Sequence, residues 1–462
     1  MTAAQTVERT STATRSDLTL ALAEKASGLR YDQISPAAKT VAGHCLLDWF
    51  GVTLAAWNEQ LAEILAADIA DEGGAAQSTI VGRGIKVPMR QAALLNGAMS
   101  HALDFDDVNF AMGGHPTVPI AATVLALGEH TGADGKRLVE AFAAGFETEC
   151  RIGRYMGPSH YARGWHNTAT YGAIGAAAAA GNLLRLDAAT TAMAMGIAAT
   201  QAAGLKSVFG TMCKPLHAGR AAATGLQSAR LAQRGFTSNP AILEVEQGFG
   251  ATQSTTTDIE DALKDPHGGF YLPQTLFKYH AACYLTHSSI EASNMLRRQH
   301  GLQADAISRV ELNVNDGHTK VCNIQAPKTG LEIKFSLRAT NALALLGENT
   351  ADDSLFSDQT AARADVIALR EKIEVRPKPV APHTLSEVVV HLKDGRVVRQ
   401  AHDVGIPMTD LARQGAALRD KFMTLAEPVV GAARAARIAD ACGRVGELPR
   451  VAELMDLARD RA

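Results

Sequence analysis

Apolar residues recur at helical spacing through most of the chain before residue 300. The stretch "ISPAAKTVAGHCLLDWFGVTLAAW" shows this period, with Ser35 placed to cap the helix and Pro36 at its first position. The same period predicts further helices over 87–102, 117–131, 135–153, 167–184, 187–203 and 215–234. Alanine and glycine dominate these segments, and small side chains let helix axes approach closely. The sequence therefore predicts a tightly packed helical core.

The pattern changes near residue 300. "ISRVELNVND" alternates apolar and polar residues as a strand does, "KIEVRP" resembles a second strand, and "SEVVVHLKDGRVVRQAH" predicts a hairpin turning at Asp394-Gly395. Helical segments at 285–298, 335–347 and 358–370 lie among these strands. After "GIPMTD" the chain is predicted to be helical to its end, with caps at Thr409-Asp410 and Pro428.

These patterns predict a mainly α protein with two domains. Residues 18–280 and 406–462 are expected to form one large all-helical domain, discontinuous in sequence because the last helices return to the first. Residues 281–405 are expected to form a smaller α+β lid, and residues 1–17 a disordered tail. No internal repeat of fixed period is present, which argues against a helical solenoid.

Composition excludes several classes of function. Among 462 residues, 20% are charged and the net charge is −3, so the chain lacks the basic surface of a nucleic-acid-binding protein. No apolar run is long enough to cross a membrane, and the polar N-terminus does not resemble a signal peptide. The six cysteines form no CxxC pair, which argues against a disulfide framework, a zinc site or an iron–sulfur cluster. We expect a cytoplasmic protein without a metal.

Five short stretches carry polar residues that a helical core does not need. In "HALDFDDVNFAMGGHPTVP", Asp104, Asp106 and Asp107 follow a helix, and His115 precedes the next one. A histidine at a helix N-terminus is favoured as neutral imidazole, which can accept a proton. The alternative is that the aspartates cap helix ends and His115 is a turn residue.

Two further stretches lie at predicted helix starts. "GWHNTATYG" places His166 at the front of a glycine- and alanine-rich helix, where a packing role is the alternative. In "CKPLHAGRAA", Lys214 stands beside the unpaired N–H groups of a first turn, which favours a bound anion there. His217 and Arg220 lie one turn apart on the same helix, and a solvated helix end is the alternative.

The fourth stretch, "KYHAACYLTH", contains Lys278, His280, Cys283 and His287, and the fifth, "TGLEIKFSLRATNALALLG", contains Arg338. HExxH, P-loop, GxGxxG and GxSxG motifs are all absent. Together the five stretches predict a pocket without cofactors, lined by lysine, arginine and histidine, for a small molecule with several carboxylates. Such a pocket suits proton transfer at a carbon beside a carboxylate.

In this order, "HALDFDD…GGHP", "GWHNTATYGAIGAAAAA", "CKPLHAGRAA", "KYHAACYLTH" and "TGLEIKFSL" resemble the MmgE/PrpD family, from about residue 18 to about residue 455. That family includes 2-methylcitrate dehydratase, cis-aconitate decarboxylase and iminodisuccinate epimerase. The resemblance implies a helical domain with a lid, a homodimer, no cofactor and a di- or tricarboxylate substrate. It places catalytic positions at Asp104, His115, His166, Lys214 and Lys278, with His287 close by. Substrate-binding positions are expected at Asp107, His217, Arg220, His280, Cys283 and Arg338.

The resemblance leaves the reaction open. Val108, Cys283 and Ala339 stand where the decarboxylase branch has threonine, histidine and tyrosine, which argues against cis-aconitate decarboxylation. "CKPLHAGR" and "KYHAACYLTH" look more similar to the iminodisuccinate epimerase branch. A dehydratase-like lyase, an epimerase and a non-catalytic polycarboxylate-binding protein therefore all stay open.

The resemblance also suggests roles for individual residues. Lys214 and Lys278 would hold substrate carboxylates, and His166 or His115 would remove the α-proton. Asp104 would orient the imidazole. His287 would support the site or serve as a second acid–base group, and Cys283 would be either a proton donor or inert packing.

Overall fold

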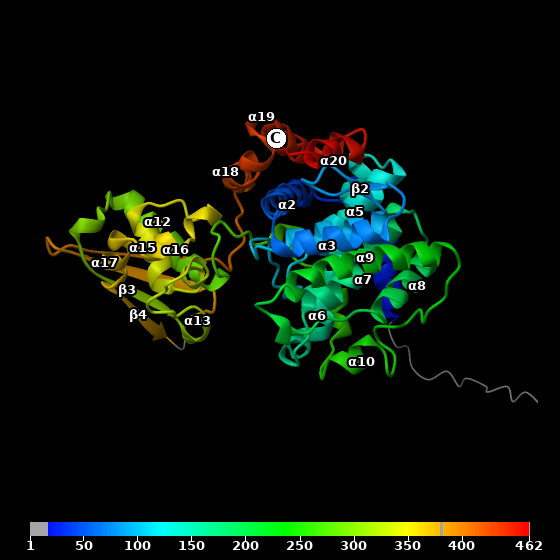
Figure 1. The fold of residues 1–462 in the computed structure, drawn as a ribbon. Coiled ribbons are helices and arrows are strands. Elements are labelled where there is room, and N and C mark those ends of the chain that lie inside the picture. Colours follow the sequence, from blue (N-terminus) through cyan, green and yellow to red (C-terminus); the bar gives the residue numbers. More distant parts are fainter. Residues whose placement is uncertain (1–16, 379–381, 462) are drawn as a thin grey trace, which may run out of the picture.

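The computed structural model describes residues 17–378 and 382–461, which fold into a large helical body and a smaller α+β body (Figure 1). Residues 1–16, where most of the predicted disordered tail falls, lie outside the described residues. The fold is mainly α with small sheets, as the sequence predicts. None of the described helices combines the length and hydropathy needed to cross a membrane.

The helical body begins with α1 (Leu18–Gly28), α2 (Pro36–Ala55), α3 (Gln60–Glu72), β1 (Ser78–Thr79), β2 (Lys86–Val87), α4 (Met89–Ser100), α5 (Thr117–Thr131), α6 (Gly135–Ala162), α7 (Asn167–Leu183), α8 (Ala188–Ala199), α9 (Cys213–Gln233), α10 (Phe249–Gln253) and α11 (Ile259–Leu263). The smaller body contains α12 (Tyr284–His300), β3 (Ile307–Asn315), α13 (Asp316–Val321), α14 (Gly330–Lys334), α15 (Leu337–Leu346), α16 (Asp358–Ala361), α17 (Ala364–Arg370), β4 (Ile373–Lys378), β5 (Leu385–Leu392) and β6 (Val397–Asp403). The chain ends with α18 (Leu411–Val430), α19 (Ala432–Gly443) and α20 (Val451–Arg459).

Local signals fix many of these boundaries. Ser35 accepts a hydrogen bond from the backbone N–H of Ala38, so it caps α2 as predicted. Asp410 caps α18 in the same way. Gly395, with φ 89°, turns β5 into β6, which confirms the hairpin.

Several helices differ from their prediction. Pro428 lies inside α18 rather than at a cap, and α19 begins after Gly431. Helix α6 continues to Ala162 across a kink at Gly157, whose φ of 59° and ψ of −168° are non-helical. Helices α1 and α3 were not predicted, and of the residues of α3 only Leu61, Ala62 and Ile69 are buried.

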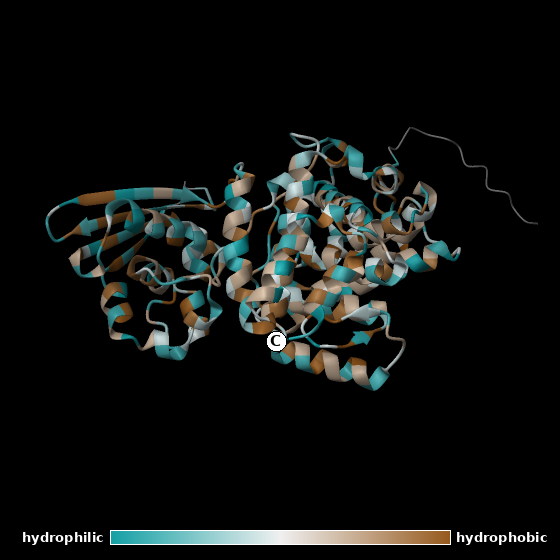
Figure 2. Ribbon diagram, turned by 90° about the horizontal axis from the view of Figure 1, so that it is seen from above, coloured by the Kyte–Doolittle hydropathy of each residue, from teal (hydrophilic) through white to brown (hydrophobic). Residues whose placement is uncertain are grey.

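Close helix packing explains the abundance of alanine and glycine. A Cβ atom at Gly225 of α9 would lie 2.3 Å from the Cβ atom of Ala176 on α7, so only glycine lets these helices meet. Figure 2 shows hydrophilic and hydrophobic residues in alternating bands along many helices, which is the pattern expected of amphipathic helices around a core.

The smaller body is a four-stranded sheet in the order β4-β3-β5-β6, with helices packed against it. Strand β3 pairs in parallel with β4 and antiparallel with β5, in the registers Val310↔Ile373 and Leu312↔Val388. Its buried side chains form a second hydrophobic core, separate from that of the helical body.

Helices α18 to α20 pack on the helical body rather than on the sheet (Figure 1). Phe422 shares the first core with Phe50 of α2. The buried Lys421 ammonium lies 2.5 Å from the carboxylate of Asp48, also on α2. Both chain ends therefore contribute to the helical body, while the exact domain boundaries stay a prediction.

Candidate active site

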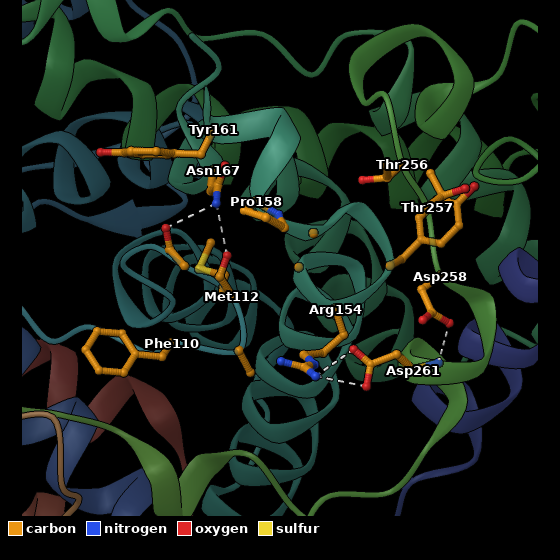
Figure 3. A pocket seen from close by; sticks show the side chains of 15 residues that line it. Phe110, Met112, Arg154, Pro158, Tyr161, Asn167, Thr256, Thr257, Asp258 and Asp261 are labelled. Atoms are coloured by element: carbon orange, nitrogen blue, oxygen red, sulfur yellow. Dashed lines mark hydrogen bonds and ion pairs between the residues drawn. The ribbon is translucent and has the colours of Figure 1, made fainter. Parts of the chain in front are cut away.

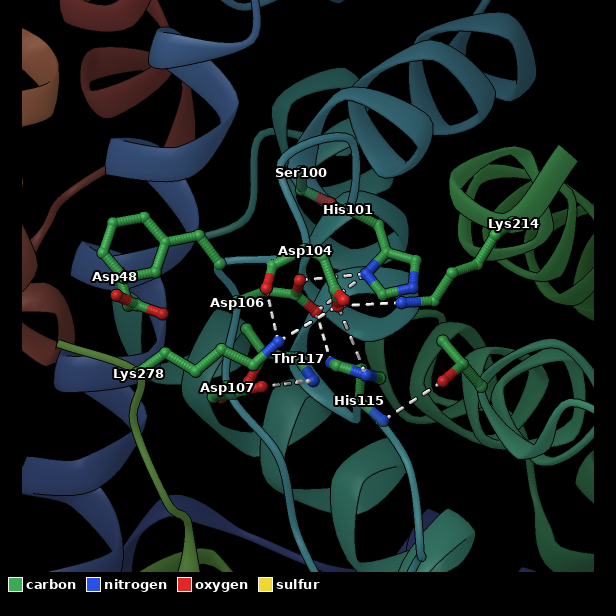
Figure 4. A network of polar contacts seen from close by, with 12 residues as sticks. Asp48, Ser100, His101, Asp104, Asp106, Asp107, His115, Thr117, Lys214 and Lys278 are labelled. Carbon is green, nitrogen blue, oxygen red and sulfur yellow. Dashed lines mark hydrogen bonds and ion pairs between the residues drawn. The ribbon is translucent and has the colours of Figure 1, made fainter. Parts of the chain in front are cut away.

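Four segments meet at one end of the helical body. The aspartate loop, residues 104–107, leaves α4, and His115 precedes the start of α5. His166 caps α7, and Lys214 lies in the first turn of α9. Val108 and Leu276 exchange two backbone hydrogen bonds of 2.9 Å, which lays the segment carrying Lys278 alongside the loop. Polar groups from distant parts of the sequence are thereby brought together (Figure 4).

Asp104 accepts hydrogen bonds from two lysines. Its Oδ1 atom lies 2.8 Å from Nζ of Lys214 and 3.0 Å from Nζ of Lys278. The left-handed φ of 51° at Asp104, uncommon for a residue other than glycine, belongs to this turn of the loop. The Asp104 side chain is 51% exposed, whereas that of Lys278 is only 3% exposed, so the carboxylate lies between solvent and a buried ammonium. The surroundings of Asp104, His115, Lys214 and Lys278 are called the hollow below.

The charges of this cluster reinforce one another. Burial alone would raise the pKa of Asp104, but Lys278 and Lys214, with smaller contributions from His115 and His101, hold that pKa well below its usual value. Burial also lowers the pKa of Lys278, and the attraction of Asp104 and Asp106 more than reverses this. Lys278 therefore keeps its positive charge although its ammonium is buried.

A second carboxylate, Asp106, binds two imidazoles. His115 Nδ1 lies 2.8 Å from Asp106 Oδ2, and His101 Nδ1 lies 2.9 Å from Asp106 Oδ1. His115 Nε2 lies 3.9 Å from Asp104 Oδ1, so it faces the carboxylate that the lysines hold. Burial lowers the pKa of His101 to about 4 although Asp106 raises it, so His101 is neutral near pH 7.

Asp107 is turned away from the hollow. It accepts hydrogen bonds from the backbone N–H and the hydroxyl of Thr117, and so ties the loop to the first turn of α5. Burial, with the nearby charges of Asp48 and Asp106, raises the pKa of Asp107 to about 7 despite the Thr117 hydrogen bond. Asp107 holds the loop in place and does not line the hollow as a substrate-binding group would.

Two more imidazoles lie beside the lysines. His166, 2% exposed, has its Nδ1 atom 3.0 Å from Nδ1 of His217. The His166 ring stacks 5.9 Å from that of His101 and meets the edge of Phe209 at 4.9 Å. Burial, followed by the neighbouring His101, His115, Lys214 and His217, holds the pKa of His166 well below its usual value.

The predicted residues of the "KYHAACYLTH" stretch separate into two places. Lys278 enters the hollow, whereas His280 and His287 line a different cavity of about 880 Å³ between the two bodies. His280 bonds Thr350 and Glu291, and His287 Nε2 lies 3.0 Å from the carbonyl oxygen of Ala282. These two histidines are thus occupied by structural partners.

Of the remaining predicted residues, Cys283 is close enough to Lys278 and Asp104 to feel their charges. Cys283 is half-buried beside Cys322, whose thiol lowers the pKa of Cys283 by hydrogen bonding to it. Arg338 donates to the side-chain oxygen of Asn323 at 2.6 Å. Arg220 is exposed and makes no ion pair with any residue that the structure describes.

Two residues of the cluster were not predicted as site residues. His101 ends α4 at the start of the "HALDFDD" stretch, and Asp106 is the middle aspartate of that stretch. The hypothesis that Asp104 orients the imidazole stays a prediction: Asp104 Oδ1 lies 3.9 Å from His115 Nε2, whereas Asp106 Oδ2 lies only 2.8 Å from Nδ1. Asp106 bonds the His115 ring, because the positive φ at Asp104 directs that side chain to the lysines instead. In the sequence, the only sign that His101 and Asp106 belong to the site was the number of polar residues in the "HALDFDD" stretch.

The fold also assembles a group of potential metal ligands that no sequence motif indicated. His101, Asp104, Asp106 and His115 each place one ligand atom within 4.8 Å of the others. However, two lysine ammoniums already bind Asp104, and their positive charge opposes a cation at the same carboxylate. The donor set therefore fits an anion better than a metal ion.

A separate cavity of about 660 Å³ lies behind the loop that leads to His115 (Figure 3). Phe110, Met112, Tyr161 and Asn167 line one side, and the Arg154–Asp261 ion pair lines the other. Asn167 donates to the carbonyl oxygens of Met112 and Gly113, so it holds that loop in place. None of the predicted site residues lines this cavity.

Comparison with known proteins places the chain in a family. The model of the MmgE/PrpD N-terminal domain matches residues 20–262, and that of the MmgE/PrpD C-terminal domain matches residues 280–444. Three relatives are each named cis-aconitate decarboxylase. The Mus musculus protein is 28% identical over 71% of this chain and 70% of its own length. The Homo sapiens protein is 27% identical over 71% and 70%, and an Aspergillus terreus protein is 30% identical over 66% and 65%. Because the two family models together cover most of the sequence in the predicted order, the chain belongs to the MmgE/PrpD family.

Proposed function

We propose that the protein is an acid–base enzyme that removes a proton from the carbon beside a carboxylate of a small di- or tricarboxylic acid, and that it acts as a lyase. One observation carries this proposal. Two lysine ammoniums converge on a single carboxylate oxygen, within 4 Å of an imidazole whose other nitrogen a buried aspartate holds. The relatives named cis-aconitate decarboxylase support a lyase that acts on a tricarboxylate.

The geometry assigns the binding of carboxylates to the lysines. Asp104 occupies the Lys214–Lys278 pair in the ligand-free protein. A substrate carboxylate has the same charge and the same acceptor atoms, so it can take the place of the Asp104 carboxylate there. The lysines then stabilise the negative charge that spreads onto that carboxylate when the adjacent carbon loses its proton.

His115 is the proposed base. Its Nδ1 atom lies 2.8 Å from Asp106 Oδ2, so a ring that carries its proton on Nδ1 has a lone pair on Nε2, the nitrogen that lies 3.9 Å from Asp104 Oδ1. The α-proton moves to Nε2, and Asp106 stabilises the imidazolium that forms. Loss of a hydroxyl group from the neighbouring carbon, with a proton from a second group, then completes a dehydration.

An epimerase is the second candidate, because a second imidazole, that of His166, lies beside the same lysines. Returning a proton to the opposite face of the carbon would invert its configuration without eliminating a group. A protein that only binds polycarboxylates is less well supported, since anion binding alone has no use for the Asp106–His115 pair.

Decarboxylation of cis-aconitate is disfavoured by three residues that depart from the decarboxylase pattern. Ala339 is 1% exposed within the lid core and offers no hydroxyl, and Val108 is paired through its backbone with Leu276. Cys283 stands in place of a histidine, and its thiol is hydrogen-bonded to that of Cys322. Decarboxylation of cis-aconitate, the reaction in the relatives' names, is therefore one of the outcomes that the test below can detect.

Proton NMR in deuterated water tests the proposal with methylcitrate, citrate, cis-aconitate and iminodisuccinate. Deuterium incorporation at the α-carbon together with a new alkene signal supports the lyase. Incorporation with inversion and no alkene supports the epimerase instead. If the wild-type protein binds these acids tightly but exchanges no hydrogen, neither enzyme is supported, and a protein that only binds polycarboxylates is the remaining candidate.

A further inference from the structure

The Nδ1 atoms of His166 and His217 lie 3.0 Å apart. The two rings are tilted by 49°, with centroids 5.2 Å apart, so they meet through these nitrogens rather than by stacking. Within the part of the chain that the structure describes, this is the only hydrogen bond that either ring makes. The contact has no part in the carboxylate binding described above, and it constrains where the protons of both rings reside.

Two imidazole nitrogens can share a hydrogen bond only when one carries a proton and the other does not. Burial lowers the pKa of both rings, and the positive charges nearby lower it further, so both are neutral near pH 7. Each neutral ring carries one proton. If His217 donates, the proton of His166 must be on Nε2; if His166 donates, its Nε2 atom carries a lone pair.

The first arrangement fits the hollow. Two lysines make it a site for anions, and an Nε2–H group is a donor to an anion whereas a bare Nε2 lone pair repels one. In the proposed function His115 supplies the lone pair, because its Nδ1 atom lies 2.8 Å from the Asp106 carboxylate and its Nε2 atom is left to take the proton. His166 with its proton on Nε2 and His115 with its lone pair on Nε2 would then offer the same substrate a donor and an acceptor.

We propose that His166 is the proton donor of the reaction. His217 is the positioning residue: its Nδ1–H donates to Nδ1 of His166 and so keeps the proton of His166 on Nε2. This assignment rests on the proposed function, and it gives each of the two proton transfers of that reaction to a different histidine. His115 takes the α-proton onto Nε2. In a dehydration His166 gives the proton on its Nε2 to the leaving hydroxyl, which departs as water, while its Nδ1 takes the proton of His217 Nδ1 and His217 takes a proton from water on its Nε2. The proton that His115 removed from the substrate returns to water, so no net proton is gained or lost.

The backbone around the pair supports this role. The N–H of His166 donates to the carbonyl oxygen of Gly204 at 2.9 Å, and a Cβ atom at Gly204 would lie 3.2 Å from Nδ1 of His217. His217 is half-buried, whereas His166 is 2% exposed. His217 can therefore exchange its proton with water and restore the donor after each turnover.

Two nearly isosteric substitutions test the proposal. The side chain of His217→Asn places an amide where Nδ1 was and can still donate to His166, whereas His217→Asp can only accept. The measurement is kcat with the polycarboxylate that the wild-type protein turns over in the NMR screen. We expect the Asn variant to lose less than about tenfold and the Asp variant about 100-fold or more, the contribution of one general acid. Equal losses in the two variants would overturn the proposal.

Exchange and nitrogen NMR separate this inference from the proposed function. In deuterated water the Asp variant should still exchange the α-hydrogen at near the wild-type rate, because the Asp106–His115 pair is untouched. Ring-¹⁵N histidine spectra, assigned against His166→Gln, should show His166 protonated on Nε2 in the wild-type protein and on Nδ1 in the Asp variant. A wild-type Nδ1 proton on His166 refutes the assignment. If the wild-type protein acts on none of the acids, the proposed function fails while the spectra still decide the tautomer.

Discussion

At the scale of single residues, Lys278 has the largest predicted effect on substrate binding. It is 3% exposed, and it donates to both the side chain and the backbone carbonyl of Asp104. Hydrogen bonds from a charged donor contribute about 1.5–3 kcal/mol each, so Lys278→Met should lower kcat/KM by roughly 10-fold to 100-fold, mostly through KM. Steady-state kinetics measure this. Lys39→Met is the matched control, because Lys39 lies over the Tyr31 ring away from the site. If Lys39→Met lowered kcat/KM as much as Lys278→Met, the loss could not be assigned to substrate binding by Lys278.

Asp107 should make stability depend on pH in the unusual direction. Its pKa is raised to about 7 in the folded protein, mainly by burial, from a reference of 3.8. Between these values the folded state holds a proton that the unfolded state has lost, so stability falls as pH rises from about 4 to about 7 and levels off above. A shift of this size corresponds to on the order of 4 kcal/mol at most. Thermal midpoints of the wild-type protein and Asp107→Asn, from pH 4.5 to 8, should therefore diverge with rising pH, and parallel curves would contradict the assignment.

The sequence predicts which residues are chemically special better than it predicts their roles. Lys214, Lys278, His115 and His166 come from segments far apart in sequence, yet the structure gathers them. The partner of His115 could not be predicted. Asp104 and Asp106 are equivalent by composition, and only the backbone turn at Asp104 decides which one faces the lysines and which one faces the imidazoles.

At the scale of elements, the contact between α4 and α9 sets the position of Lys214 and His217. A Cβ atom at Gly219 of α9 would lie 2.0 Å from the carbonyl oxygen of Leu94, so an added methyl must push the two helices apart. Gly219→Ala should destabilise the protein by about 1–3 kcal/mol or more, and should lower kcat by displacing the front of α9. Denaturant unfolding and steady-state kinetics measure the two effects.

Gly28→Ala is the control for that substitution. Gly28 ends α1, and nothing lies within 4 Å of a Cβ atom built there. It should change stability by less than about 1 kcal/mol, in the stabilising direction. If both substitutions proved equally tolerated, α4 and α9 would not be as tightly apposed as the structure shows.

Helical periodicity predicts the elements well because the helices that build the core are long and apolar on one face. It fails where the signal is weak or interrupted. The exposed helix α3 offers only Leu61, Ala62 and Ile69 as buried positions, and α6 runs beyond residue 153, where its predicted segment ends, and across the kink at Gly157. The tertiary contacts that continue α6 to Ala162 are not visible in a local pattern.

At the scale of the whole molecule, α18 joins the two chain ends to the active site. Lys421 lies 2.5 Å from Asp48 of α2 and donates to the carbonyl oxygen of Phe105 at 2.7 Å, within the aspartate loop. Asp48 and Lys421 are both about 2% exposed. Lys421→Met leaves an unpaired buried carboxylate, so it should cost about 3–5 kcal/mol and also loosen the loop. Thermal unfolding checks the first effect, and a larger KM for the substrate checks the second. The double variant that adds Asp48→Leu should recover most of the stability but not the loop contact.

The same packing predicts how the chain can be cut. The core of the helical body contains Phe422 and other side chains of α18 to α20 together with those of α1 to α9, so residues 18–280 alone would expose the apolar surface that these helices cover. His280 and Ile406 line one cavity, so a short glycine–serine linker can join residue 280 to residue 406 in place of the lid. We expect the joined chain, 18–280 with 406–462, to unfold in one cooperative thermal transition. The 18–280 chain should aggregate or unfold without a cooperative transition. Circular dichroism on heating and size-exclusion chromatography distinguish the two chains. A cooperative 18–280 chain would mean that the helical domain is continuous in sequence and that the last helices belong with the lid.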